Sequence, residues 1–330
     1  MKAAERYLQA ARSVYIACHI IPDGDAIGSM LGLGLAVRKL GKLCTMACAD
    51  PVPPKFGFLC GAQEVIAAPP SNEELIATVD SSAIDRLGSL YDEAAFAGRP
   101  VINIDHHVTN TLFGTVNVVQ PLPSTAEIVL ALIRRLSVPL DRDIATALLT
   151  GLVTDTRSFR TGNVTARQLR TTLALMKAGA SLPEVTELVF NREPISHICL
   201  WGQALANVQT RGRIIWTEVD RAMMRQCGAS PNEGNGLVSF LASAMGVDVA
   251  VVLREQDDGR IEASMRAGPG WDISGVALEF GGGGHPRAAG CTVAGEMSQV
   301  RERLLTSIER ALREQEGQHQ SISLALCDRP

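Results

Sequence analysis

The first part of the chain alternates short apolar runs with longer amphipathic stretches. The apolar runs are four or five residues long, as buried parallel strands are, and they cover Val14–Cys18, Leu43–Ala47, Leu75–Val79 and Val101–Ile104. Between the first two, Ala26–Leu40 has a helical pattern and is followed by Gly41, a typical residue after a helix end. The alternation predicts an α/β domain with a mostly parallel sheet over residues 1–190.

The pattern changes after further helices predicted at Ser124–Leu136, Asp141–Val153 and Ala166–Ala178. Glu187–Asn207 is predicted to form one long bent helix, with a helical linker at 191–205. Strands are predicted at Arg213–Val219, Val247–Arg254 and Arg260–Arg266, the last two joined by the hairpin signal Asp257-Asp258-Gly259. With a helix at Met297–Gln315, these elements predict a smaller α+β domain over 206–315 and a tail at 316–330.

Composition narrows the class of protein. The 330 residues suit two domains, and no apolar run approaches the roughly 18–20 residues that span a bilayer. Without a secretory segment the expected location is the cytoplasm, and the eight cysteines, which form no CxxC pair, are expected to be reduced. The net charge of −4 argues against binding of long nucleic acid, because such binding requires many basic groups to neutralise phosphates.

Three of the predicted strands end in residues that bind metal ions. Val14–Cys18 leads to His19, Asp23 and Asp25, Leu75–Val79 leads to Asp80, and Val101–Ile104 leads to Asp105, His106 and His107. The carboxyl ends of parallel strands meet at one edge of a sheet, with neighbouring strands about 4.8 Å apart. So many carboxylates in one place repel each other unless a cation lies among them. The sequence therefore predicts a metal centre.

The ligand types indicate which metal is expected. Carboxylates and imidazoles without thiolates suit Mn²⁺ better than Zn²⁺ or Ca²⁺, with Co²⁺ or Mg²⁺ as substitutes. One six-coordinate ion cannot use all of these groups, whereas two ions that share a bridging carboxylate can. Such a pair, about 3.5–4 Å apart, activates water and stabilises both oxygens in phosphoester hydrolysis.

Four sequence motifs carry a family resemblance. His19-x3-Asp23-x-Asp25-x2-Gly28-Ser29, Asp80, Asp105-His106-His107 and Asp155-Thr156 resemble the motifs of the DHH phosphoesterase superfamily. The run GGGGHPRAAG, from Gly281 to Gly290, resembles the glycine-rich signature of the DHHA1 domain. Together they span nearly the whole chain, which is similar in size to the stand-alone bifunctional oligoribonucleases (nanoRNases) and 3′-phosphoadenosine-5′-phosphate (pAp) phosphatases. The resemblance implies an active site in the cleft between the two domains.

The resemblance also implies roles for individual residues. One Mn²⁺ is expected on His19, Asp23 and Asp80, and the second on Asp25, Asp80, His106 and Asp155, so that Asp80 bridges the ions. His107 is expected to contact the scissile phosphate and Asp105 to orient an imidazole. Arg157, where many relatives have a small residue, is expected to add a phosphate contact or change the fit of the substrate.

In the second domain, the resemblance implies a substrate-binding loop. Gly282, Gly283 and Gly284 let backbone N–H groups approach a phosphate or base without a Cβ in the way, and His285 follows them. Arg266 resembles the phosphate-gripping arginine of the family. Arg86, six residues after Asp80, is placed similarly to another family position, and its role stays open.

The expected function is hydrolysis of short oligoribonucleotides or pAp to mononucleotides by a hydroxide between the two ions, as in a 3′–5′ oligoribonuclease or a 3′(2′),5′-bisphosphate nucleotidase. Alternatives are a cyclic di-AMP or pApA phosphodiesterase, a RecJ-type single-strand exonuclease, a manganese inorganic pyrophosphatase and a non-catalytic nucleotide-binding protein. The aromatic content of 4% disfavours a long single-strand channel. A homodimer is left open.

Overall fold

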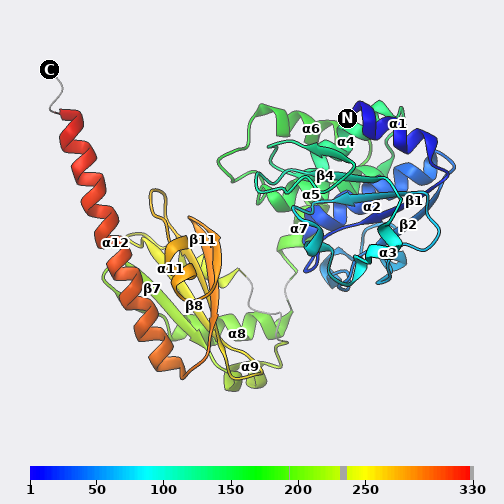
Figure 1. The fold of residues 1–330 in the computed structure, drawn as a ribbon. Helices are drawn as coiled ribbons and strands as arrows, with labels where there is room; N and C mark the ends of the chain where they lie inside the picture. Colours follow the sequence, from blue (N-terminus) through cyan, green and yellow to red (C-terminus); the bar gives the residue numbers. More distant parts are fainter. Residues whose placement is uncertain (193, 231–235, 328–330) are drawn as a thin grey trace. The chain divides into compact units, whose positions relative to one another are not determined.

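The computed structural model describes residues 1–192, 194–230 and 236–327. The chain forms two compact units, Met1–Arg192 and Glu193–Pro330, and each unit is built on its own sheet (Figure 1). In the described part of the chain, no helix combines the length and the apolar character that a membrane span requires.

The first unit contains a five-stranded, fully parallel sheet with the order β2-β1-β3-β4-β5. Its strands are β1 (Ser13–Ala17), β2 (Leu43–Ala47), β3 (Leu75–Val79), β4 (Val101–Asp105) and β5 (Val116–Val119). The predicted α/β class and the four predicted strands are confirmed. The edge strand β5 was not predicted, because its sequence VNVV is short and interrupted by a polar residue.

The two faces of this sheet are covered unequally. The main core lies under the long helices, which are α1 (Lys2–Ala10), α2 (Gly24–Lys39), α4 (Thr125–Arg135), α5 (Arg142–Asp155), α6 (Ala166–Lys177) and α7 (Leu182–Phe190). A smaller cluster on the other face packs Tyr15 and Ile76 under the 3₁₀ segment Ile84–Leu90 and the short helix α3 (Glu93–Phe96). Short 3₁₀ turns also occur at Pro54–Phe56 and Ala62–Glu64.

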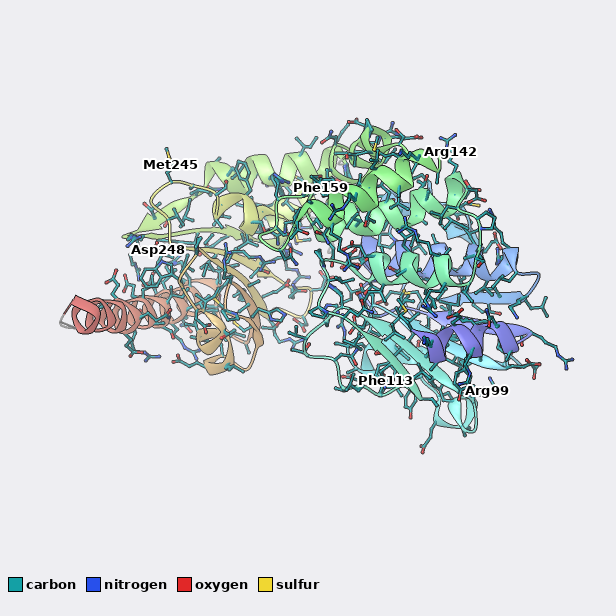
Figure 2. All side chains as sticks on the ribbon, turned by 90° about the horizontal axis from the view of Figure 1, so that it is seen from above. Arg99, Phe113, Arg142, Phe159, Met245 and Asp248 are labelled. Atoms are coloured by element: carbon teal, nitrogen blue, oxygen red, sulfur yellow. A yellow bond between two sulfur atoms is a disulfide. The ribbon has the colours of Figure 1, made fainter. Side chains whose placement is uncertain are left out.

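Helices α2 and α5 pack closely because glycines line their contact. A Cβ added to Gly28 of α2 would collide with the backbone oxygen of Ala147 and lie 2.9 Å from the backbone nitrogen of Gly151, both on α5. At Gly32, an added Cβ would meet the side chain of Leu148. The close approach of the two helices fixes their ends relative to the sheet edge. Figure 2 shows Arg142 at the start of α5 and Phe159 just beyond its end.

The second unit contains a mixed six-stranded sheet with the order β10-β11-β9-β8-β7-β6, in which only β7 and β8 pair in parallel. The strands are β6 (Gln209–Arg211), β7 (Ile214–Val219), β8 (Val249–Glu255), β9 (Ile261–Ala267), β10 (Gly283–His285) and β11 (Ala288–Val293). Helices α11 (Ser274–Glu279) and α12 (Met297–Cys327) cover one face, and α8 (Ile195–Ala206), α9 (Arg221–Cys227) and α10 (Leu237–Leu241) cover the other (Figure 1). The predicted α+β class is confirmed.

The predicted long helix over Glu187–Asn207 is wrong. Helix α7 ends at Phe190, and α8 begins at Ile195 with Pro194 as its N-cap residue. A proline restricts the residue before it and donates no backbone N–H, so a helix starts after it more readily than it continues through it. The predicted linker at 191–205 thus falls largely on α8, whereas α12 continues beyond its predicted end at Gln315.

The expectation that all eight cysteines are reduced is also wrong. Cys199 of α8 and Cys227 at the end of α9 form a disulfide, with their Cα atoms 5.5 Å apart. The two residues are 28 positions apart in sequence, and only the packing of α8 beside α9 brings them together. No spacing rule applied to the sequence indicates this pair.

Candidate active site

The carboxyl edge of the first sheet gathers the residues that the sequence singled out. Three groups of side chains each have candidate ligand atoms within 4.8 Å of one another: His19, Asp23 and Asp80; Asp80, His106 and His107; and Asp25, His106 and Asp155. Asp80 belongs to two of these groups and His106 to two. The three groups therefore form one continuous cluster of carboxylates and imidazoles.

Asp80 lies at the centre of the cluster. It directly follows β3 and takes a left-handed backbone conformation with φ of 56°, which Asp tolerates better than most residues. Its side chain is 2% exposed, and its Oδ1 accepts a hydrogen bond of 2.9 Å from the Thr125 hydroxyl. The two carboxylate oxygens face different imidazoles: Oδ2 lies 3.6 Å from His19 Nε2, and Oδ1 lies 3.5 Å from His106 Nε2.

His19 and Asp23 have backbone contacts that leave ligand atoms available. The 2.7 Å bond from His19 Nδ1 to the Ile20 oxygen assigns the ring proton to Nδ1, so that Nε2 keeps its lone pair. Asp23 is the N-cap of α2, and its Oδ1 accepts from the backbone N–H groups of Asp25 and Ala26. Its Oδ2 takes no part in the cap.

Asp25 is fully buried and is held by two helices. It lies in the first turn of α2, and its Oδ1 accepts from the Ser29 hydroxyl at 3.2 Å. The N-terminus of α4 points two backbone N–H groups at it, Thr125 N at 2.6 Å and Ala126 N at 3.0 Å. These donors satisfy the otherwise unpaired start of α4 and fix the carboxylate.

His106 connects β4 to the end of α5. Its Nδ1 bonds to the Leu122 oxygen at 2.9 Å, which directs Nε2 toward Asp155 Oδ2 at 3.2 Å. Asp155 is the last residue of α5, which continues two residues beyond its predicted end at Val153. Together with Asp25, these two residues form one of the three groups of candidate ligands.

Asp105 and His107 form a hydrogen-bonded pair, in which His107 Nδ1 also lies 3.7 Å from Asp80 Oδ1. Asp105 is fully buried, and its Oδ1 lies 2.8 Å from His107 Nδ1 and accepts from the His106 backbone N–H. Asn110 donates to Asp105 Oδ2 and also bonds to Asn103 Oδ1, so the carboxylate is held from both sides. The hydrogen bond with Asp105 raises the pKa of His107 against the opposing effect of burial. The His107 side chain is 39% exposed and can reach a bound molecule.

The charges of the cluster are not balanced by the protein alone. Burial raises the pKa of Asp25 and of Asp155 well above the usual range, and the neighbouring carboxylate of Asp80 raises both further. Burial also acts to raise the pKa of Asp80, but the imidazoles of His19, His106 and His107 outweigh it and lower that pKa. Divalent cations among these oxygens would remove the repulsion, so the donor set fits metal ions.

Arg157 lies directly beyond this cluster. It follows α5 and opens a left-handed turn, with φ of 47° at Arg157, 56° at Ser158 and 64° at Phe159. The turn is closed by hydrogen bonds from Arg157 N to the Thr154 oxygen and from Ser158 N to the Val153 oxygen. Arg157 is exposed, and its charge opposes the rise in the pKa of Asp155.

In the second unit, the predicted glycine loop is mostly a strand. Gly281 makes a left-handed turn after α11, and Gly283–His285 form the edge strand β10 against β11. A Cβ on Gly282 would collide with the Gly290 oxygen, and one on Gly284 would lie 2.6 Å from the Ala289 Cα. Two of the glycines are therefore required by close strand packing, which the prediction of a loop did not include.

Arg266 and His285 share one row of this sheet. His285 pairs with Ala288 of β11, and Ala288 pairs with Arg266 of β9. Directly opposite residues in antiparallel strands point to the same face. The buried neighbours of Arg266 on β9, Met265 and Ala267, belong to the core under α11 and α12, so Arg266 and His285 point to the opposite face.

Several residues of the site were missed in the sequence. Thr125, Asn110 and Gly151 hold or adjoin the central carboxylates, whereas Ser29, which donates to Asp25, was already part of the first motif. Ser124-Thr125 was recognised only as the start of a helix, and Asn110 is one polar residue among others in a loop. Arg86, whose role was left open, has its Nη2 3.3 Å from His19 Nδ1 and 3.5 Å from the Ile20 oxygen.

Comparison with known proteins agrees with this arrangement. Residues 13–152 match the DHH family, N-terminal domain, and residues 219–314 match the DHHA1 domain. The chain is 36% identical to the bifunctional oligoribonuclease and PAP phosphatase NrnA of Thermus thermophilus over 94% of both chains. It is 25% identical to the protein of the same name from Bacillus subtilis, over 90% of this chain and 94% of that one.

A solved structure has the same fold over almost its whole length. The exopolyphosphatase-related protein of Bacteroides fragilis superposes with a TM-score of 0.86 at 23% identity and covers 95% of each chain. The predicted resemblance is thus confirmed by the two domain matches and by the extent of the Thermus similarity. This chain belongs to the DHH phosphoesterases that carry a DHHA1 domain.

Proposed function

We propose that this chain is a two-metal phosphoesterase that cleaves short oligoribonucleotides and pAp to mononucleotides. The observation that carries the proposal is the position of Asp80, whose two oxygens face His19 on one side and His106 on the other. A carboxylate between two sets of ligands is the arrangement that two neighbouring cations require. The names of the Thermus and Bacillus relatives support the substrate class.

The residues would hold two Mn²⁺ ions in the way that the family resemblance implies. His19, Asp23 and Asp80 would bind one ion, and Asp25, Asp80, His106 and Asp155 the other. Mixed imidazole and carboxylate donors without thiolate favour Mn²⁺, with Co²⁺ or Mg²⁺ as substitutes. When bound, such ions lower the pKa of a water and neutralise the charge of the phosphate oxygens.

His107 supplies the group that meets the phosphate. Because Nδ1 is bonded to Asp105, Nε2 is the ring nitrogen left to face a bound phosphate, and the raised pKa of His107 favours the protonated ring, which donates there. Asp105 holds the ring in place and is itself held by Asn110. The protein thus presents a fixed hydrogen-bond donor next to the proposed metal ions.

Recognition of the nucleotide falls to the second unit. Arg266 and His285, on one face and in one row of its sheet, offer a cation and an imidazole to a phosphate or base of the substrate. Arg157 adds a third basic group, next to Asp155. Short substrates suit so small a number of basic groups, because few phosphates need to be neutralised.

Incubating the purified chain with Mn²⁺ and a labelled diribonucleotide or pAp tests the proposal. Release of mononucleotide or AMP is expected, and loss of release in chelator is expected as well. Parallel assays with pApA, cyclic di-AMP and pyrophosphate identify the preferred substrate. Binding of the dinucleotide without release of any product would contradict the proposal.

A further inference from the structure

A second cluster of charge lies in the first unit, outside the metal-ligand cluster. Helices α4 and α6 border a pocket of about 230 Å³ that is lined by three arginines, Arg134, Arg167 and Arg170, together with Glu127, Leu130, Ala131 and Thr171. Helix α4 contributes positions 127, 130, 131 and 134, and α6 contributes 167, 170 and 171. These spacings place each set on one face of its helix. The pocket is therefore a groove between two rigid helices.

The only acidic side chain in this groove is already engaged. The Glu127 side chain is 2% exposed and accepts hydrogen bonds from Gln168 Nε2 at 2.7 Å and from the Thr171 hydroxyl at 3.2 Å. Arg167 lies beside it, with Nε 3.5 Å from Glu127 Oε1. Glu127 therefore pairs with Arg167 beside the groove, and its carboxylate leaves almost no surface open to a ligand.

Arg134 and Arg170 differ from Arg167, which lies beside a carboxylate of the groove. Both are exposed, and within the described part of the chain neither guanidinium group makes a hydrogen bond or ion pair with another residue. Two guanidinium groups on facing helices, with a third fixed beside them, create a local excess of positive charge on a chain whose net charge is −4. Guanidinium groups match the geometry of phosphate and carboxylate oxygens, and of these two anions a phosphate carries the larger negative charge.

The groove is separate from the metal-ligand cluster. Helix α4 begins at Thr125, which contacts Asp80 and Asp25, whereas Arg134 lies nine residues further along. At 1.5 Å per residue, this is about 13 Å along the helix axis. A phosphate bound at Arg134 and Arg170 therefore does not lie among the carboxylates of the cluster.

We propose that this groove, lined by Arg134, Arg167 and Arg170, is a second phosphate-binding site. Its ligand is a phosphate group, either free or as the distal phosphate of an oligonucleotide. The proposal goes beyond the phosphoesterase function and does not depend on it, since binding can be measured when no hydrolysis takes place.

The test compares two variants of the full chain in EDTA. In Arg134→Gln/Arg170→Gln the free guanidinium groups are replaced by neutral side chains, and in the matched control Lys177→Gln a basic residue of α6 outside the groove is replaced. Calorimetry measures the binding of inorganic phosphate and of a tetraribonucleotide. Equal melting temperatures for both variants and the parent chain establish that folding is unchanged.

We expect the double variant to lose at least about tenfold in affinity for one of the two probes, and the control to lose none. Weaker binding of inorganic phosphate identifies a site for free phosphate. Weaker binding of the tetranucleotide alone, with a smaller dependence on salt, identifies a site for distal phosphates of an oligonucleotide. Unchanged affinity for both probes, or an equal loss in Lys177→Gln, would overturn the proposal. Because hydrolysis is not measured, the outcome is independent of the proposed phosphoesterase function.

Discussion

Asp25 occupies the space that a side chain on Gly151 would need. A Cβ built on Gly151 of α5 would lie 2.6 Å from Asp25 Oδ1 and 3.3 Å from the Asp25 Cα. The buried carboxylate can therefore reach the N-terminus of α4 only because α5 has no side chain at this point. One glycine outside the sequence motifs thus determines the position of a proposed metal ligand.

Gly151→Ala is accordingly expected to lower activity without removing any ligand. The added methyl group would displace Asp25 or separate α2 from α5, at a cost of about 1–3 kcal/mol in folding stability. A ligand displaced by about 1 Å can lower the rate on the order of 10²-fold. Steady-state hydrolysis of a dinucleotide and thermal melting measure both effects.

The matched control is Gly202→Ala in α8, where an added Cβ meets no atom within 4 Å. Here we expect unchanged activity and a gain of roughly 0.5–1 kcal/mol, because Ala favours the helix over Gly. Equal activity in the two variants would refute the role of Gly151.

Asp80→Ala is expected to abolish turnover. Loss of the central carboxylate removes a ligand from both proposed ions, and the rate should fall at least about 10³-fold, which is roughly 4 kcal/mol of barrier. Asp85→Ala, at an exposed aspartate a few residues further on, serves as the control and should retain full activity. Parent-like hydrolysis by metal-supplied Asp80→Ala would show that Asp80 is not a bridging ligand.

Removal of metal should act on stability as well as on activity. EDTA is expected to abolish hydrolysis and to lower the melting temperature, because the carboxylates of the cluster then repel each other. Mn²⁺ should restore hydrolysis and the melting temperature most fully, and Co²⁺ should restore them in part. Ca²⁺, which prefers more oxygen ligands, should not restore activity. Full activity in excess chelator would rule out the two-metal proposal.

Asp155→Asn should stabilise the metal-free chain at neutral pH. The raised pKa of Asp155 means that the folded state keeps a proton which the unfolded chain releases near pH 4. Stability therefore falls as the pH rises from about 4 to the raised folded-state value and stays low above it. Asn carries no titrating proton and avoids this loss.

In thermal melts with EDTA at pH 7, we expect Asp155→Asn to unfold on the order of 2–4 °C higher than the parent chain. A gain of about 1 kcal/mol in folding free energy gives a shift of this size in a unit of this length. Near pH 3 the two should coincide. With Mn²⁺ present, the variant should have lost activity. A lower melting temperature at pH 7 without metal would contradict the assigned direction.

His285→Ala and Arg266→Ala should separate recognition from chemistry. Neither residue belongs to the metal-ligand cluster, so the metal content should be unchanged. We expect kcat/KM on dinucleotides to fall roughly 10- to 10³-fold, with KM carrying part of the loss. Hydrolysis of bis-p-nitrophenyl phosphate, which has no nucleotide to bind, should change much less. Equal loss on both substrates together with loss of metal would place these residues in the metal site instead.

The sequence predicted the sheet edge because two patterns coincide there. Buried strands give continuous apolar runs, and the polar residues directly after them must lie at the carboxyl edge, so His19, Asp80 and Asp105 could be placed near each other without a structure. The assignment of His19 and Asp80 to particular ions, and of Asp105 to orienting an imidazole, came from the family resemblance and stays a proposal, although the geometry brings His19 and Asp80 together.

Other features depended on contacts between distant segments. The donors to Asp25 come from Thr125 and Ala126, about a hundred residues away, and the disulfide joins two helices through their packing. The strand β10 was mistaken for a loop because glycines usually indicate turns, whereas here Gly282 and Gly284 let two backbones approach. Periodicity within a segment carries no information about such partners.

The mixed sheet of the second unit ends in a very short strand at both margins. Strands β10 and β6 have three residues each, whereas the inner strands β8 and β9 have seven. An exposed sheet margin invites pairing with another chain and so promotes aggregation, and short edge strands are one way in which proteins prevent it. The glycine-rich margin therefore also limits the length over which a second molecule could extend the sheet.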